Sequence, residues 1–184
     1  MLGTKKLALT FGEGKQGLKG FTDADRASQE HRHTISGYVY ILDGGAVSWA
    51  SKKQELITLS TTEVKYVSAM HAAKEGIWLC QLIEEVFHPL THPMPLYSDS
   101  QLVIVLTKDG SYHARTKHID IRYHFICFVV DNHSLRLVYC LTDSMPVADT
   151  LTKALPSVKA KHFAASLGLH SILGGVLDCT NAVD

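Results

Sequence analysis

The chain has 184 residues, 46% of them hydrophobic, and its 18 lysines and arginines balance 18 aspartates and glutamates. This length and composition are typical of a globular protein with one buried core, and a net charge of zero excludes an overall basic field that would attract nucleic acid. No apolar run reaches membrane-spanning length and no secretory signal begins the sequence, so we expect an intracellular protein without a membrane partner.

The first half of the chain predicts an antiparallel meander. Residues 18–25 form a strand-like segment that ends in carboxylates, and two further strands are joined by a glycine-rich tight turn at Asp43-Gly44-Gly45. A fourth strand-like segment, Leu56–Leu59, completes the meander. Glycines interrupt the sequence after Leu7–Phe11, so we expect residues 1–17 to be a leader outside the main fold.

A long helix is predicted from Ser60 to Phe87. Ser60 and Glu63 have the spacing of a capping box, in which each side chain pairs with a backbone N–H of the first turn. An apolar stripe follows at three- and four-residue spacing: Tyr66, Ala69, Met70, Ala73 and Ile77. This helix therefore needs a sheet or other helices to cover it.

The second half alternates strands with helices. We expect strands at Leu96–Asp99 and Leu135–Cys140, and helices at 100–107, around 119–130, from about 147, and at 158–167, the last closed by Gly168. Residues 170–184 show no clear period and are predicted to be a disordered tail. The cysteines Cys80, Cys127, Cys140 and Cys179 lie far apart and predict free thiols.

Three aspartates lie at the ends of predicted elements. Asp23 and Asp99 end two strands, and Asp149 begins a late helix. If these ends meet at one edge of a sheet, the carboxylates raise each other's pKa unless a cation such as Mg²⁺ lies between them. The alternative is three ordinary surface aspartates.

Several linked motifs resemble the ribonuclease H domain at the end of copia-type retrotransposon polyproteins. In chain order they are Phe21-Thr22-Asp23-Ala24-Asp25, Ser36-Gly37-Tyr38-Val39, Gly44-Gly45-Ala46-Val47-Ser48-Trp49, Ser51-Lys52-Lys53-Gln54, Leu59-Ser60-Thr61-Thr62-Glu63, Tyr97-Ser98-Asp99-Ser100-Gln101, residues 116–125 and residues 148–155. The resemblance implies an α/β ribonuclease H-like fold over residues 18–169, with a five-stranded mixed sheet and helices on both faces. Residues 1–17 would then be a remnant of the connection to the polymerase.

The resemblance also implies a chemistry. Asp23, Asp99 and Asp149 match three of the family's four metal-binding acids, which hold two Mg²⁺ ions, or Mn²⁺, and hydrolyse the RNA strand of an RNA–DNA hybrid. Ser100 and Gln101 would reach the hybrid backbone. The reverse transcriptase part of the polyprotein is the implied protein partner, and a cytoplasmic virus-like particle is the implied location.

The fourth acid is missing from its place. The family pattern puts a glutamate where this sequence has Lys65, and Glu63, a possible substitute, points about 200° away around the helix at roughly 100° per residue. A lysine there would neutralise the aspartates and compete with metal, unless its long stem carries the ammonium out to solvent. Arg26, Leu102-Val103 and Leu141 also depart from the family pattern. We therefore expect impaired hydrolysis.

Other readings stay open. The cluster Arg115, Lys117, His118 and Arg122 is either a phosphate-contacting patch or an ordinary solvated face. His118 and His124 fall on different helical faces, which argues against a zinc site with His113 and Cys127. The alternatives to an impaired nuclease are a non-catalytic module of this fold with at most weak hybrid binding, a remnant without function, or an integrase-like nuclease acting on DNA. The sequence does not predict the oligomeric state.

Overall fold

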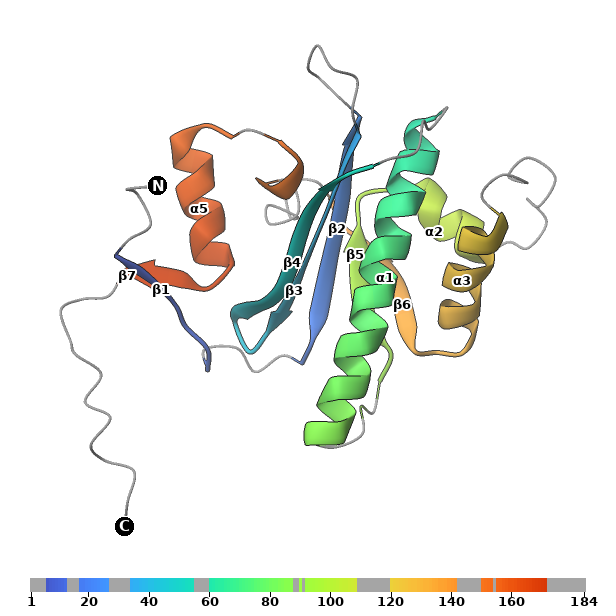
Figure 1. Ribbon diagram of the computed structural model, residues 1–184, viewed down its shortest axis with the longest axis horizontal. Helices are drawn as coiled ribbons and strands as arrows, with labels where there is room; N and C mark the ends of the chain where they lie inside the picture. The colour runs from blue at the N-terminus through green and yellow to red at the C-terminus, as the bar shows by residue number, and fades with distance from the viewer. Residues whose placement is uncertain are drawn as a thin grey trace.

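The computed structural model describes residues 6–12, 17–26, 34–54, 60–87, 90, 92–108, 120–141, 150–153 and 155–171. Its elements, in chain order, are β1 (Leu7–Leu9), β2 (Lys19–Arg26), β3 (Thr34–Leu42), β4 (Gly45–Lys53), α1 (Thr61–Val86), β5 (Met94–Ser98), α2 (Gln101–Lys108), α3 (Asp120–Asp131), β6 (Leu135–Tyr139), α5 (Ser157–Ser166) and β7 (Leu169–Ser171) (Figure 1). None of the helices in these ranges has the length and apolar character needed to cross a membrane.

The central sheet has five strands in the order β4-β3-β2-β5-β6. Strands β2, β3 and β4 are antiparallel, whereas β5 lies parallel to both β2 and β6, so the sheet is mixed. The β3–β4 hairpin turns at Asp43 and Gly44, whose φ angles of 50° and 87° are those that a tight primed turn requires. The predicted fold class is confirmed. The predicted strand Leu56–Leu59 lies outside the described residues.

Alternate residues of β3 supply the two sides of the sheet. Tyr40 faces α1, where its hydroxyl donates to the carbonyl oxygen of Ala72 at 2.6 Å, and it belongs to the main core that α1 forms with α2, α3 and the sheet. Val39 and Ile41 face the other way and form, with Ala46, a second hydrophobic core on the opposite face of the sheet. Figure 1 shows α5 on the side of the sheet opposite α1.

Helix α1 begins as the capping box predicts. The Ser60 side chain accepts a hydrogen bond from the backbone N–H of Glu63 at 3.2 Å, and the helix runs to Val86. Four of the five stripe residues are buried, whereas Ile77 is half-buried against the same core. The C-terminal half leaves four apolar side chains exposed: Trp78, Leu82, Val86 and Phe87.

The N-terminal segment differs from the expectation of a leader outside the fold. β1 pairs antiparallel with β7, so that Leu9 lies opposite Leu169. Leu9 also packs against the second hydrophobic core, which contains Val39 and Ile41. The backbone N–H of Thr10 donates to Gly168 at 2.9 Å. Sequence patterns cannot reveal the pairing of two three-residue strands from opposite ends of the chain, because neither strand has a period of its own. β7 also extends past residue 169, and the tail beyond Ser171 lies outside the described residues.

Candidate metal and nucleic-acid site

Asp23 lies within β2, near the end of the sheet where α1 begins. Its side chain is buried, and its Oδ2 accepts a hydrogen bond from the Thr152 hydroxyl at 2.8 Å. The Lys153 ammonium lies 4.0 Å from the same oxygen. Two cationic or hydrogen-bonding groups from residues 150–153 therefore reach the Asp23 carboxylate.

The pKa of Asp23 is raised above its ordinary value. Burial is the main cause, and the negative charge of Asp99 adds to it, while the Thr152 hydrogen bond and the Lys153 charge act in the opposite direction. The two aspartates therefore interact electrostatically. Asp23 does not end its strand as predicted, because β2 continues to Arg26. The convergence of all three aspartates stays a prediction, since Asp149 lies outside the described residues.

Asp99 directly follows β5, whose Ser98 pairs with Thr22 in the parallel β2–β5 ladder. Thr22 precedes Asp23 and Ser98 precedes Asp99, and parallel strands run in the same direction. This register therefore brings Asp99 to the same end of the sheet as Asp23. The Asp99 Oδ2 lies 2.6 Å from the Lys65 Nζ, with the two side chains 13% and 22% exposed. Asp99 is thus held by a partly desolvated, charge-assisted hydrogen bond.

Lys65 lies in the first turns of α1, at the place of the expected glutamate. Its ammonium does not extend to solvent but turns toward the carboxylates and contacts Asp99. Of the two arrangements that the sequence left open, the structure has the one in which the ammonium pairs with a carboxylate, and the partner is Asp99.

A buried polar network holds the start of α1 against the sheet. The Ser68 hydroxyl donates to the backbone oxygen of Asp23 at 2.7 Å and lies 3.0 Å from the Thr22 hydroxyl. On the other side, the Gln54 amide donates to the Val64 carbonyl oxygen at 3.0 Å and to the Ser36 hydroxyl. These bonds fix the helix that carries Lys65.

Sequence reasoning assigned no role to Thr152, Lys153 or Ser68. Thr152 and Lys153 follow Asp149 by three and four residues, a helical spacing that would put them on the same side as Asp149, and this signal could have identified them. Asp149 itself lies outside the described residues. The helical residues that follow it, 150–152, carry Thr152 to Asp23.

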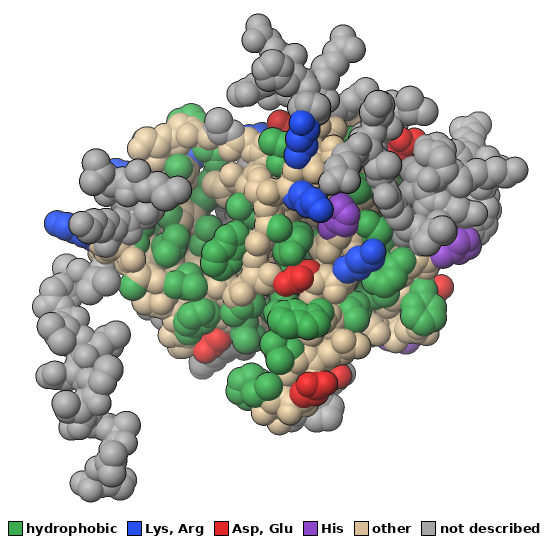
Figure 2. Space-filling model, in the orientation of Figure 1, with side chains coloured by type: hydrophobic (Ala, Val, Ile, Leu, Met, Phe, Trp, Pro, Cys, Tyr) green, Lys and Arg blue, Asp and Glu red, His purple; other side chains and the backbone are tan. Residues whose placement is uncertain are grey.

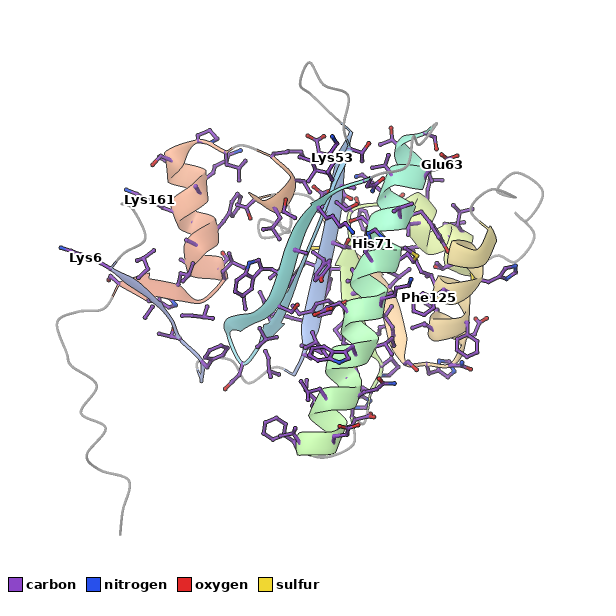
Figure 3. All side chains as sticks on the ribbon, viewed as in Figure 1. Lys6, Lys53, Glu63, His71, Phe125 and Lys161 are labelled. Carbon is purple, nitrogen blue, oxygen red and sulfur yellow. The ribbon has the colours of Figure 1, made fainter. Side chains whose placement is uncertain are left out.

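The predicted nucleic-acid contacts have different surroundings. Ser100 is buried, and its hydroxyl accepts from the Val103 N–H at 3.4 Å, so it caps α2, whereas Gln101 is exposed on the first turn of that helix. Arg115 and Lys117 lie outside the described residues, as does the side chain of Arg122. Glu63 lies at the start of α1 (Figure 3). Contact of any of these residues with a nucleic acid remains a prediction.

An ammonium group lies near one carboxylate oxygen of each described aspartate. The Lys65 Nζ is 2.6 Å from the Asp99 Oδ2 and the Lys153 Nζ is 4.0 Å from the Asp23 Oδ2, and both positive charges oppose the binding of a magnesium ion there. Within the described ranges, no three His, Cys, Asp or Glu residues are placed to hold a metal ion. Cys80, Cys127 and Cys140 form no disulfide among the described residues.

Comparison with known sequences finds relatives among transposon proteins. The chain is 43% identical over 171 residues to the retrovirus-related Pol polyprotein from transposon TNT 1-94 of Nicotiana tabacum, an alignment that covers 92% of this chain and 13% of the relative. It is 35% identical over 164 residues to the Pol polyprotein from transposon RE2 of Arabidopsis thaliana, covering 87% of this chain and 11% of the relative. The chain thus spans about an eighth of the length of these relatives. No family model matches it.

Solved structures with a similar fold are ribonucleases H. LC11-RNase H1, determined in complex with an RNA/DNA hybrid, matches with a TM-score of 0.53 and 14% identity over 73% of this chain and 92% of that one. The N-terminal RNase H domain of a Mycobacterium tuberculosis protein matches with a TM-score of 0.54 and 13% identity, over 79% of this chain and 99% of that one. At such low identity, these matches establish the fold alone.

Proposed function

The chain is an RNase H-like domain related to the Pol polyproteins of plant transposons, and we propose that it recognises RNA–DNA hybrids but is impaired in hydrolysing their RNA strand. The observation that carries the proposal is the 2.6 Å contact between the Lys65 ammonium and Asp99. The resemblance in the sequence puts a glutamate at this place, so the substitution changes the local charge by two units.

The positive charges beside the two aspartates are the physical reason for the impaired hydrolysis. A cation that binds Asp99 must displace the Lys65 ammonium and then lie close to a positive charge in a partly desolvated site, where Coulomb interactions are stronger than in water. Lys153 adds a second positive charge beside Asp23. Both effects lower the affinity of the site for divalent cations, which the expected hydrolysis needs at Asp23, Asp99 and Asp149.

Two observations support a role in hybrid recognition. A structure with this fold was solved with an RNA/DNA hybrid, and Gln101 is exposed just after Asp99, where a backbone could contact it. The relatives are Pol polyproteins several times longer than this chain. We therefore infer that the partner is the reverse transcriptase portion of such a polyprotein.

The test is restoration of the acid. Lys65→Glu should cleave an RNA–DNA hybrid in Mg²⁺ or Mn²⁺ about a hundredfold faster than the wild-type chain, the effect typical of one electrostatic group in an active site. The double variant Lys65→Glu/Asp99→Asn should lose this gain, because the restored acid acts together with Asp99. Hybrid cleavage is followed with end-labelled RNA, and hybrid binding by fluorescence anisotropy.

Three outcomes have distinct meanings. Strong cleavage by the wild-type chain, abolished by Asp99→Asn but unaffected by Lys65→Ala, would overturn the impairment. If Lys65→Glu stays inactive while hybrid binding persists, the chain is a non-catalytic module of this fold. Cleavage of duplex DNA but not of the hybrid would instead indicate an integrase-like nuclease.

A further inference from the structure

A pocket of about 410 Å³ lies beside the C-terminal half of α1. Its walls are one face of α1, the segment just before β5 and the turn between α3 and β6, with lining residues that include Ile77, Cys80, Glu84, Leu90, Pro93 and Ser134. We call this cavity the distal pocket. We propose that the distal pocket binds a guanidinium group carried on an apolar stem.

The fold separates the distal pocket from the carboxylate site. The pocket lies where Met94 begins β5, whereas Asp99 follows the other end of that strand. The Met94 N–H donates to the backbone oxygen of Ser134 at 3.3 Å, which holds the turn after α3 against the start of β5. Glu84 follows Lys65 by 19 positions along α1, or about 28 Å at 1.5 Å per residue. The distal pocket is therefore a separate site.

Part of the lining is apolar and belongs to the edge of the main core. On α1, Ile77 and Cys80 are three residues apart and share one helical face, the first half-buried and the second buried. Leu90, from the segment before β5, packs against the same core as Ile77. An apolar stem that lies against these side chains removes apolar surface from water.

Glu84 gives the distal pocket a negative charge. Its side chain is exposed, and among the described residues it forms no ion pair. One carboxylate oxygen accepts a long hydrogen bond from the Leu90 N–H, at 3.4 Å, so the carboxylate keeps further lone pairs for a ligand. Burial, and secondarily the charge of Glu84, raise the pKa of the Cys80 thiol to about 11. The charge of Glu84 is therefore felt at the buried side of the pocket.

The surroundings of the distal pocket do not neutralise this charge. Neither lysine nor arginine is among its described lining residues, and the next residue of α1, Glu85, is a second exposed acid. In Figure 2 the charged side chains at the lower end of the face, where α1 ends, are acidic, and none of those drawn there belongs to a lysine or arginine. An entering cation would compensate the charge of Glu84.

The combination of acceptors and apolar groups favours a guanidinium over an ammonium. The Glu84 carboxylate, the Gln81 amide oxygen and the Ser134 hydroxyl are acceptors in the lining. A guanidinium presents five N–H donors in one plane and is more weakly hydrated than an ammonium, so its transfer next to Ile77 and Leu90 costs less. The volume falls within the roughly 300–1,000 Å³ typical of small-molecule pockets and accommodates the stem as well as the charge.

The test uses butylguanidine as the probe. Its binding to the full chain is followed by NMR chemical-shift changes at about pH 8, where an ordinary imidazole is neutral. Glu84→Gln should weaken binding roughly tenfold, because a neutral hydrogen bond replaces a charge-assisted one. The matched control is Glu85→Gln, which removes the same charge from the adjacent exposed residue outside the lining. Methylguanidine, which lacks the stem, should bind roughly tenfold more weakly than butylguanidine.

The proposal stands if Glu84→Gln loses affinity, Glu85→Gln keeps it, and both variants melt like the wild-type chain. Equal losses in the two variants would indicate attraction by net charge alone and overturn it. Absence of binding by the wild-type chain would also overturn it, as would equal or tighter binding of the neutral butylurea or of butylammonium.

A second probe identifies the source of the guanidinium group. This probe is a tripeptide with a central arginine, acetylated and amidated at its ends. If it binds more tightly than butylguanidine and still depends on Glu84, the proposal stands with an arginine side chain of a protein as the ligand. If it binds more weakly while butylguanidine binding depends on Glu84, the proposal stands with a free guanidinium compound.

Discussion

At the scale of single residues, the carboxylate site is defined by how its charges are paired. Lys65 compensates Asp99 directly, at 2.6 Å, whereas Lys153 approaches Asp23 only to 4.0 Å. Asp23 is the more deeply buried of the two aspartates, and its pKa is raised by burial and by Asp99. Its ionised form is therefore less favourable in the folded protein than in the unfolded chain.

The raised pKa of Asp23 predicts that the stability of the folded protein depends on pH. Since the folded-state pKa of Asp23 is raised above its ordinary value, its contribution to stability is full below that ordinary pKa and is lost as the pH rises through the folded-state pKa. Asp23→Asn keeps an acceptor for the Thr152 hydroxyl and removes the charge. It should raise the melting temperature at neutral pH in the presence of EDTA, with the gain shrinking toward about pH 4. An equal melting temperature at every pH would contradict this assignment.

At the scale of elements, α1 is the part of the fold that the sequence predicts best. The Ser60 cap, the start of the helix and most of the buried stripe follow from local spacing, which neighbouring residues alone determine. Most of strand β5, which ends just before Asp99, is predictable for the same reason. The direction of the Lys65 side chain was not predictable, because it depends on Asp99, which is 34 residues away. The roles of Thr152 and Ser68 likewise depend on contacts across the fold.

The cap of α1 gives a test at this scale. Ser60→Ala removes the acceptor for the Glu63 N–H and should lower the free energy of unfolding by about 1 kcal/mol, the usual cost of losing such a cap. Ser166→Ala is the matched control, because the Ser166 hydroxyl bonds to the His162 carbonyl oxygen within α5 and caps no helix start. Urea denaturation measures both variants. Equal stabilities for Ser60→Ala and the wild-type chain would show that the cap contributes nothing.

At the scale of the whole molecule, segments from the two ends of the chain meet at the β3–β4 turn. The Gly168 carbonyl oxygen accepts from the N–H and the hydroxyl of Thr10, at 2.9 and 3.1 Å, and the Ala46 N–H donates to Leu167 at 3.0 Å. The Gly12 N–H donates to Asp43 at 3.0 Å. Local sequence signals cannot predict these contacts, since each joins residues that are more than thirty positions apart.

Gly168 is the residue on which this junction depends. Its φ is +84°, and a Cβ there would lie 2.8 Å from the Gly44 oxygen and 2.9 Å from the Gly45 Cα, both backbone atoms. Gly168→Ala should therefore lower the free energy of unfolding by about 1–3 kcal/mol, through backbone strain and displacement of the turn. Gly17→Ala is the control, because a Cβ at Gly17 meets nothing within 4 Å. Urea denaturation should show a large loss for Gly168→Ala and little change for Gly17→Ala. Similar stabilities for the two variants would mean that the junction of the chain ends does not stabilise the sheet.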